Sequence, residues 1–182
     1  MTSKIACVGQ TTVKLQQGRS VLMMDPVGVS DKADVVLLSG SSLGLDKDTI
    51  QAVVKSSTKV VAPPWLAKDL FDTVDEGQLV VLSPQESSDL GDFKIQAMPA
   101  YRLQRLFDKD LERKNGYLIT AGGQSYYFAG PTDLIPEMNV IDVDTAVLPV
   151  GGDSMDLFEA LASTNVIGAK VFVPVAYEEN PE

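Results

Sequence analysis

Short apolar runs separated by turn residues divide the first forty residues into strands. Three runs are rich in β-branched and apolar side chains, and they cover residues 4–8, 12–16 and 20–24. Gly9 and Gln17-Gly18 supply turn signals between them. Residues 34–38 form a continuous apolar run, which is typical of a buried strand. The chain is therefore expected to open as a strand meander that leads into the interior of a sheet.

The hydrophobic period changes from strand to helix after Asp46. Ile50, Val53 and Val54 fall on one helical face, and the Asp46 side chain is placed to accept from the first free amides as an N-cap. Residues 59–62 return to the strand pattern, and the prolines that follow open a second helix. The pattern predicts an alternation of strands and helices.

The second half repeats this organisation. Five further strands are predicted at residues 79–82, 93–98, 117–120, 125–129 and 145–149, and a closing strand at 171–175. An amphipathic helix is expected over residues 154–164. Two β-rich halves, each followed by helices, favour two sheets packed face to face with helices outside. We expect an α+β fold in one domain, residues 1–182, with a loose tail over residues 178–182.

Charge narrows the classes of partner. The chain carries 15 Lys and Arg against 25 Asp and Glu, a formal charge of −10, and an acidic surface repels phosphate backbones and anionic lipid. No apolar run approaches the roughly 20 residues of a membrane helix, and no signal-peptide core follows the N-terminus. We therefore expect a cytoplasmic protein that binds neither nucleic acid nor membrane.

The sequence contains no histidine and one cysteine. A single chain therefore cannot use a mechanism that needs an imidazole as base, acid or metal ligand. This excludes a Ser-His-Asp triad and a histidine-ligated zinc hydrolase. A single thiol cannot form an intrachain disulfide or a zinc site of several thiolates. Cys7 lies within a strand pattern and is expected in the core.

Several short strings, in order along nearly the whole chain, resemble metallo-β-lactamase-fold hydrolases, and most closely the branch of L-ascorbate-6-phosphate lactonase. The strings are Gly9-Gln10, Met24-Asp25-Pro26, residues 35–39 followed by 45–50, Ala62-Pro63-Pro64, Pro99-Ala100-Tyr101, Tyr127-Phe128-Ala129-Gly130, Ile135-Pro136-Glu137-Met138, Pro149-Val150-Gly151-Gly152 and Val173-Pro174. The resemblance implies a four-layer αββα sandwich.

That family holds one or two metal ions at an edge of the sandwich, on a loop written H-x-H-x-D-H and on later histidine and aspartate residues. The resemblance places these ligand positions on residues that are neither histidine nor aspartate: Ser39, Ser41, Leu43, Gly44, Arg102, Pro131 and Ala176. The family's usual Gly-His near the start is Gly9-Gln10, and Tyr177 is the side chain retained from the closing motif. The resemblance therefore implies a metal site whose ligands have been replaced.

Zinc needs three or four converging N, S or O ligands, which leucine and glycine side chains cannot supply. A guanidinium at Arg102 would repel a dication, and we hypothesise that it replaces the metal's charge beside carboxylates such as Asp25 or Asp153. Gln10, Asp25, Asp133, Asp153 and Tyr177 are the candidate cleft residues.

Each of these signals also has a structural explanation. Residues 39–42 could form an anion-binding nest, but a strand-to-helix turn is favoured. Asp153 is favoured as the N-cap of the following helix over a residual acid in the cleft. Asp25 before a proline most often ends a strand and fixes a turn.

The leading functional hypothesis is a catalytically inactive relative, a pseudoenzyme without cofactor that binds a protein, a second copy of itself or a small molecule. The alternative is a metal-dependent hydrolase with an all-oxygen site built from Asp25, Asp133 and Asp153, suited to Mg²⁺, Mn²⁺ or Ca²⁺ and acting on a lactone, a phosphate-bearing or another ester-like substrate. A metal-free hydrolase that uses a serine of residues 39–42, with Lys47 as the nearest lysine, is a third hypothesis.

Overall fold

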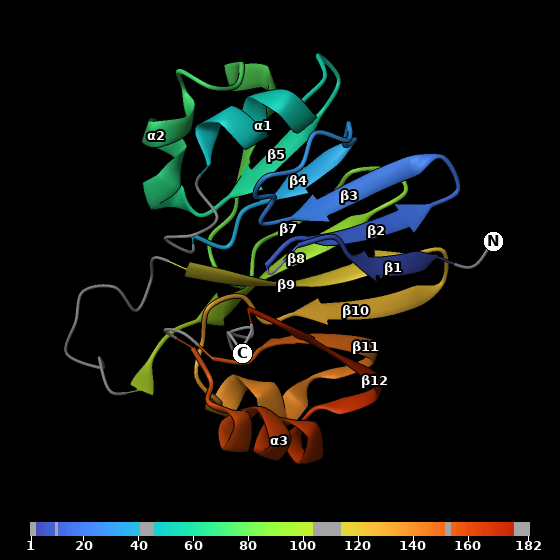
Figure 1. Cartoon of the computed structure of the whole chain (residues 1–182), viewed down its shortest axis with the longest axis vertical. Coiled ribbons are helices and arrows are strands. Elements are labelled where there is room, and N and C mark those ends of the chain that lie inside the picture. The colour runs from blue at the N-terminus through green and yellow to red at the C-terminus, as the bar shows by residue number, and fades with distance from the viewer. Residues whose placement is uncertain (1–2, 10, 41–45, 104–113, 152–153, 177–182) are drawn as a thin grey trace, which may run out of the picture.

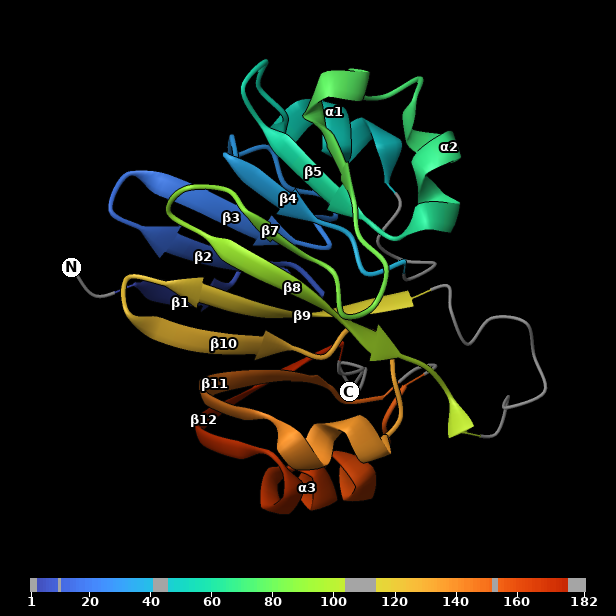
Figure 2. The same ribbon diagram turned by 180° about the vertical axis from the view of Figure 1, so that it is seen from behind.

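The protein consists of two six-stranded sheets packed face to face, with helices on both outer faces (Figures 1 and 2). The structure is a computed structural model, and it describes residues 3–9, 11–40, 46–103, 114–151 and 154–176. The predicted α+β fold and its four-layer αββα arrangement are confirmed.

The first sheet follows the chain order β1-β2-β3-β4-β5-β6. Its strands are β1 (Lys4–Cys7), β2 (Val13–Gln17), β3 (Ser20–Met24), β4 (Val35–Leu37), β5 (Lys59–Ala62) and β6 (Leu79–Val81). The first three are antiparallel, and β3 to β6 are parallel. The parallel connections carry α1 (Lys47–Val53), η1 (Pro64–Leu66), α2 (Ala67–Leu70) and η2 (Glu76–Gln78).

The second sheet has the order β12-β11-β10-β9-β8-β7. Its strands are β7 (Ser87–Asp89), β8 (Lys94–Ala100), β9 (Lys114–Ala121), β10 (Gln124–Phe128), β11 (Asp142–Pro149) and β12 (Gly168–Val175). Strands β7 to β10 form an antiparallel meander, and β10, β11 and β12 are parallel. The crossovers carry η5 (Pro136–Val140) and α3 (Leu157–Val166).

The core has three parts, one for each interface between layers. The central part lies between the sheets and includes fully buried Leu15, Leu22 and Tyr117. A second part packs α1 and α2 on the first sheet through residues such as Ile50, and a third packs η5 and α3 on the second sheet. Since each buried large apolar side chain contributes roughly 1.5 to 3 kcal/mol, these contacts hold the layers together.

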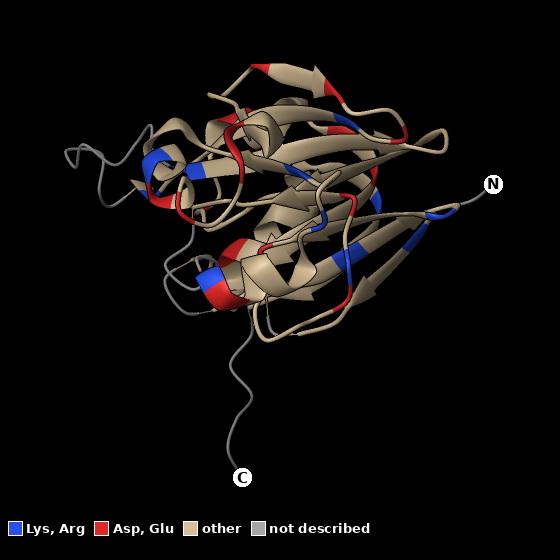
Figure 3. Cartoon of the chain, turned by 90° about the horizontal axis from the view of Figure 1, so that it is seen from above, with Lys and Arg blue, Asp and Glu red and all other residues tan. Residues whose placement is uncertain are grey.

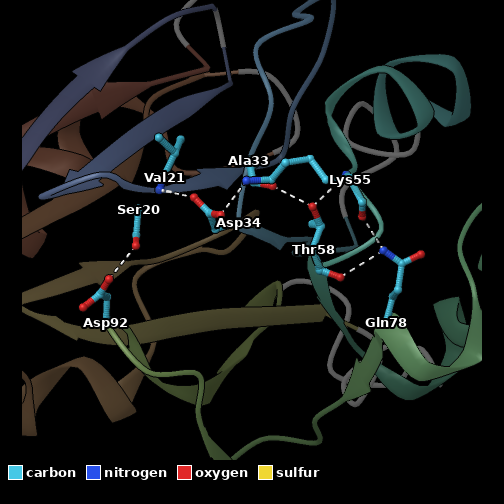
Figure 4. Close-up of polar contacts among 8 residues, drawn as sticks. All are labelled: Ser20, Val21, Ala33, Asp34, Lys55, Thr58, Gln78 and Asp92. Atoms are coloured by element: carbon cyan, nitrogen blue, oxygen red, sulfur yellow. Dashed lines mark hydrogen bonds and ion pairs between the residues drawn. The ribbon is translucent and has the colours of Figure 1, made fainter.

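Polar side chains fix the edge of the first sheet at which its parallel strands begin. The Asp34 carboxylate pairs with the Lys55 ammonium, and the Thr58 hydroxyl donates to the carbonyl of Ala33 (Figure 4). The amide nitrogen of buried Gln78 donates to the carbonyls of Lys55 and Thr58. These bonds set the starts of β4, β5 and β6 relative to one another.

Several local predictions are confirmed and several are wrong. Asp46 caps α1 by accepting from the Thr49 amide, as predicted. Cys7, expected in the core, is exposed because β1 is an edge strand.

The N-cap of α3 is Asp156, not the predicted Asp153. The Asp156 side chain accepts from the Glu159 amide in a capping box, so the helix begins after position 153. Asp153 lies outside the described residues.

Strand β7 was not predicted, because its sequence Ser-Ser-Asp is polar and it joins the sheet only through backbone pairing with β8.

In the view of Figure 3, Lys and Arg are interspersed with Asp and Glu and do not gather in one region. Within the described parts of the chain, none of the helices combines the length and apolar character that crossing a membrane requires.

The close approach of β9 to β10 requires a glycine at position 116. A Cβ atom there would lie 2.8 Å from the Ala129 carbonyl oxygen and 2.9 Å from that of Phe128. We predict that Gly116→Ala lowers the free energy of unfolding by about 1 to 3 kcal/mol, because the backbone must shift to admit the methyl group. Urea denaturation measures this, with Gly77→Ala as the control because a Cβ at Gly77 meets open space. Equal losses in both variants would contradict the prediction.

Candidate functional site

Parallel strands of both sheets end at one edge of the sandwich, and the predicted site residues of the described chain lie there. Asp25 follows β3, and Ser39 follows β4. Gly130 follows β10 and contacts the other sheet, since a Cβ at this position would lie 3.3 Å from Ser39 Cβ. The carboxyl ends of parallel strands are where side chains converge on a ligand in many α/β proteins. We call this the carboxyl edge.

A buried carboxylate joins the ends of β3 and β4. The Ser39 amide donates to Asp25 Oδ1 at 2.8 Å, and the Ser39 hydroxyl donates to Oδ2 at 2.5 Å. Asp25 has a φ of 42°, a left-handed conformation that Asp and Asn tolerate better than most residues. The Thr12 hydroxyl donates to the Asp25 carbonyl and so holds the turn. Both oxygens of the carboxylate are thus used within the first sheet.

Ser39 also connects the first sheet to the second. Its carbonyl accepts from the Asn115 amide at 2.8 Å, and the adjoining Leu38 carbonyl accepts from the Tyr117 hydroxyl at 2.7 Å. The Asn115 side chain donates to the Leu82 carbonyl at 2.7 Å. We call Asp25, Ser39, Asn115 and Tyr117 the floor network. All four are buried, so hydrogen bonds within the protein replace most of those that water would make, while Asn115 Oδ1 finds no partner among the described residues.

Burial dominates the electrostatics of the floor network. It raises the pKa of Asp25 to about 6, and the two bonds from Ser39 oppose this shift only in part. Burial also raises the pKa of Tyr117, so that its hydroxyl remains protonated and donates to Leu38. A carboxyl group with a pKa near neutrality is therefore fixed beneath the carboxyl edge.

Asp133 holds a second part of this edge. Its Oδ2 accepts from the Leu103 amide at 2.8 Å, and its own amide donates to the Tyr101 carbonyl at 3.0 Å. The Thr132 hydroxyl bonds the backbone of Tyr101 as well. These bonds fix residues 101–103, so half-buried Arg102 is set at the carboxyl edge by its neighbours on both sides.

The Tyr101 ring extends from this segment toward η5. Its hydroxyl donates to the Glu137 carboxylate at 2.9 Å, and burial together with that carboxylate raises the pKa of Tyr101 to about 12. Tyr101 therefore stays protonated at neutral pH and anchors the segment that carries Arg102.

The residues of this edge do not fit the metal centre that the family resemblance implies. The chain has no imidazole. Both oxygens of Asp25 and one of Asp133 already accept hydrogen bonds, and no three Cys, Asp or Glu side chains of the described chain gather closely enough to hold a metal ion. Structural and catalytic zinc sites need at least three protein ligands.

The structure separates the predicted site residues into two groups. Those within the described chain lie at the carboxyl edge: Asp25, Ser39, Arg102, Pro131, Asp133 and Ala176. The others lie outside the described residues: Gln10, Ser41, Leu43, Gly44, Asp153 and Tyr177.

Ser39 lies in the segment after β4, for which a strand-to-helix turn was the favoured interpretation. Because it is fully buried and its amide and hydroxyl both donate to Asp25, it does not offer its amide to an anion nest, and its correspondence to a former metal ligand stays a prediction. The same geometry makes Ser39 unsuitable as the nucleophile of a metal-free hydrolase. It is a structural residue of the floor network.

Sequence reasoning missed Asn115 and Tyr117. The available signal was Gly116, since a glycine inside a strand can mark a point of close backbone approach, but nothing in the sequence marks the neighbouring Asn115 as buried. Only the tertiary structure shows that this strand start meets the loop after β4.

Comparison with known proteins identifies the family. The description "Beta-lactamase superfamily domain" belongs to a family model that matches residues 4–176, nearly the whole chain. The chain belongs to the beta-lactamase superfamily. This superfamily member is 28% identical to a UPF0173 metal-dependent hydrolase of Geobacillus sp. (strain WCH70), over 98% of the chain and 87% of that relative. A UPF0173 metal-dependent hydrolase of Shouchella clausii is 26% identical with the same coverage.

Solved structures share the fold of this superfamily member. A crystal structure of a candidate metal-dependent hydrolase from Parabacteroides distasonis superposes with a TM-score of 0.87 at 29% identity, covering 98% of this chain and 84% of the other. Igni18, a metallo hydrolase of Ignicoccus hospitalis, shares the fold with a TM-score of 0.78 at 20% identity, again over 98% and 84% of the two chains. The narrower resemblance to the ascorbate-6-phosphate lactonase branch stays a prediction.

The raised pKa of Asp25 predicts a particular pH dependence of stability. Below about pH 3 the carboxyl is protonated in the folded and unfolded states alike. As the pH rises to about 6 the unfolded state loses its proton first, so the free energy of unfolding falls by about 3 kcal/mol on reaching neutral pH. Asp25→Asn should abolish this decrease, because an amide does not titrate. The variant should still fold, since Asn also tolerates a positive φ and bonds Ser39 through its amide.

Urea denaturation of the wild type and of Asp25→Asn between pH 4 and pH 7 measures the difference in slope. Asp72→Asn is the matched control, because Asp72 is exposed and lies outside the floor network. Parallel pH profiles for the wild type and Asp25→Asn would contradict the assignment.

Proposed function

We propose that this member of the superfamily is a pseudoenzyme that keeps the hydrolase scaffold without its metal centre and acts by binding a protein or a small molecule. The observation that carries the proposal is the absence of histidine from all 182 residues, in a chain whose relatives are named metal-dependent hydrolases. A site that must hold a transition metal ion without imidazole depends on oxygen or thiolate ligands alone.

The contacts of the remaining carboxylates support this proposal. Asp25 is buried and each of its oxygens accepts a bond from Ser39, so to ligate a metal at the surface of this edge its carboxylate would have to turn outward and release the Ser39 amide and hydroxyl, two buried donors. Each such donor costs about 1 to 3 kcal/mol. Asp133 would likewise have to release the Leu103 amide or use its second oxygen alone. Cys7, the one thiol of the chain, is exposed at the end of β1, in the same row as Val13 and Met24, but within the described residues it belongs to no group of three Cys, Asp or Glu side chains that could hold a metal ion.

A second candidate function is a metal-dependent hydrolase with an altered, all-oxygen site. The names of the relatives favour it, since chains 26% to 29% identical over 98% of this sequence are called metal-dependent hydrolases. Such a site would use Asp25, Asp133 and Asp153, with a hard cation such as Mg²⁺ or Mn²⁺ and a lactone or phosphoester as substrate. The residues of this chain favour the first candidate, and the names of its relatives favour the second.

Thermal denaturation in the presence of Zn²⁺, Mn²⁺ or Mg²⁺ distinguishes these candidates. A pseudoenzyme should show no increase in Tm with any of the three, whereas an ion that binds the folded state at 100 times its Kd adds about 2.7 kcal/mol. The Geobacillus relative, treated identically, is the positive control. A metal-dependent rise in Tm that Asp133→Asn removes would contradict the pseudoenzyme, and so would hydrolysis of a lactone or phosphoester that a chelator abolishes.

A further inference from the structure

The outward face of α3 is apolar and carries no charge. Leu157, Phe158 and Leu161 point away from the second sheet, and they are 59%, 79% and 55% exposed. Ala162 and Asn165, also exposed, complete the same side of the helix, because positions i, i+4 and i+8 lie above one another. We call these five residues the α3 face.

The opposite side of the helix already packs on the protein. Ala160 and Ser163 are buried, and the helix closes the outer core of the second sheet beneath it (Figure 2). Helices at a protein surface normally place charged and polar residues on the side that faces water, whereas this side of α3 carries Leu157, Phe158 and Leu161. The α3 face therefore exposes apolar side chains to water at positions where a surface helix normally carries polar residues.

The size of the apolar surface fits one class of partner. The η5 helix packs beside α3 and adds Val140, which is 84% exposed. Half to four-fifths exposed, these side chains together present on the order of 400 to 500 Å² of apolar surface, which is the size of a sizeable surface patch. A standard interface buries about 800 Å² on each partner, of which about 60% is apolar. The α3 face with Val140 thus supplies the apolar share of one such interface.

Charge limits where two copies of this chain can meet. Two chains that each carry a formal charge of −10 repel one another over most of their surfaces. In α3 the only charged residue is Glu159, and its carboxylate accepts from the Asp156 amide in the capping box at the start of the helix. Because the α3 face itself is uncharged, two copies can meet there with the least like-charge repulsion.

We propose that the α3 face is the interface of a homodimer, in which α3 of one copy packs against α3 of another around a two-fold axis. Such an interface is isologous, so one self-complementary patch serves both copies. The inference does not depend on the proposed function, because α3 covers the outer face of the second sheet and contributes nothing to the floor network. It holds equally for a pseudoenzyme and for a hydrolase.

Sedimentation equilibrium of the wild type, Phe158→Glu and Phe71→Glu tests the proposal. Phe71 is the matched control, since it is an exposed aromatic residue on the first sheet's side of the molecule. We expect the wild type and Phe71→Glu to be dimers at about 100 μM, because standard interfaces give micromolar or tighter Kd values. Phe158→Glu should raise the dimer Kd at least about 30-fold, because it buries a charge at the centre of the interface.

Circular dichroism shows whether each variant remains folded, and Leu161→Lys serves as an independent second disruption of the α3 face. A wild-type protein that is monomeric at about 100 μM would overturn the proposal and leave the α3 face to a partner of another sequence. A dimer that Phe158→Glu and Leu161→Lys leave intact would place the interface elsewhere and overturn it as well.

Discussion

The sandwich depends at its carboxyl edge on the hydrogen bonds of a single buried serine. Ser39 gives both of its donors to the Asp25 carboxylate and its carbonyl to the Asn115 amide, so it connects β3 and β4 to the opposite sheet. Burial makes these bonds costly to leave unmade. The loops that begin at Gly40 and Gly130 therefore start from fixed points, although the sheets are otherwise held together by apolar contacts.

The same interaction limits the chemistry that this edge can perform. The Asp25 carboxylate is buried and accepts two hydrogen bonds inside the first sheet, so it supports structure rather than facing a ligand in solvent. The fold of the beta-lactamase superfamily is present here in a chain without imidazole, and Asp25 and Asp133 at this edge hold backbone segments in place. Membership of the superfamily explains the fold, and the side chains of this particular sequence must explain the activity.

Most of the fold could be predicted from sequence, because strand and helix periods reflect burial on one or both faces of each element. β3 and β5 have the predicted boundaries, and Asp46 caps α1 as expected. Cys7 was misplaced, because sequence does not show that β1 is an edge strand. The N-cap of α3 was placed at Asp153 instead of Asp156, because both aspartates precede the apolar run. Asn115 and Tyr117 were missed since their partners, Ser39 and Leu38, are more than 70 residues away in sequence.

Equilibrium dialysis of the purified protein against Zn²⁺ and Mn²⁺, followed by elemental analysis, measures most directly whether a metal centre survives. A scaffold without its metal site should retain less than about 0.1 equivalent of either ion, since three converging ligands are required for tight binding. Retention of about one equivalent, lost when Asp25 or Asp133 is replaced by asparagine, would show instead that this edge still binds a catalytic cation.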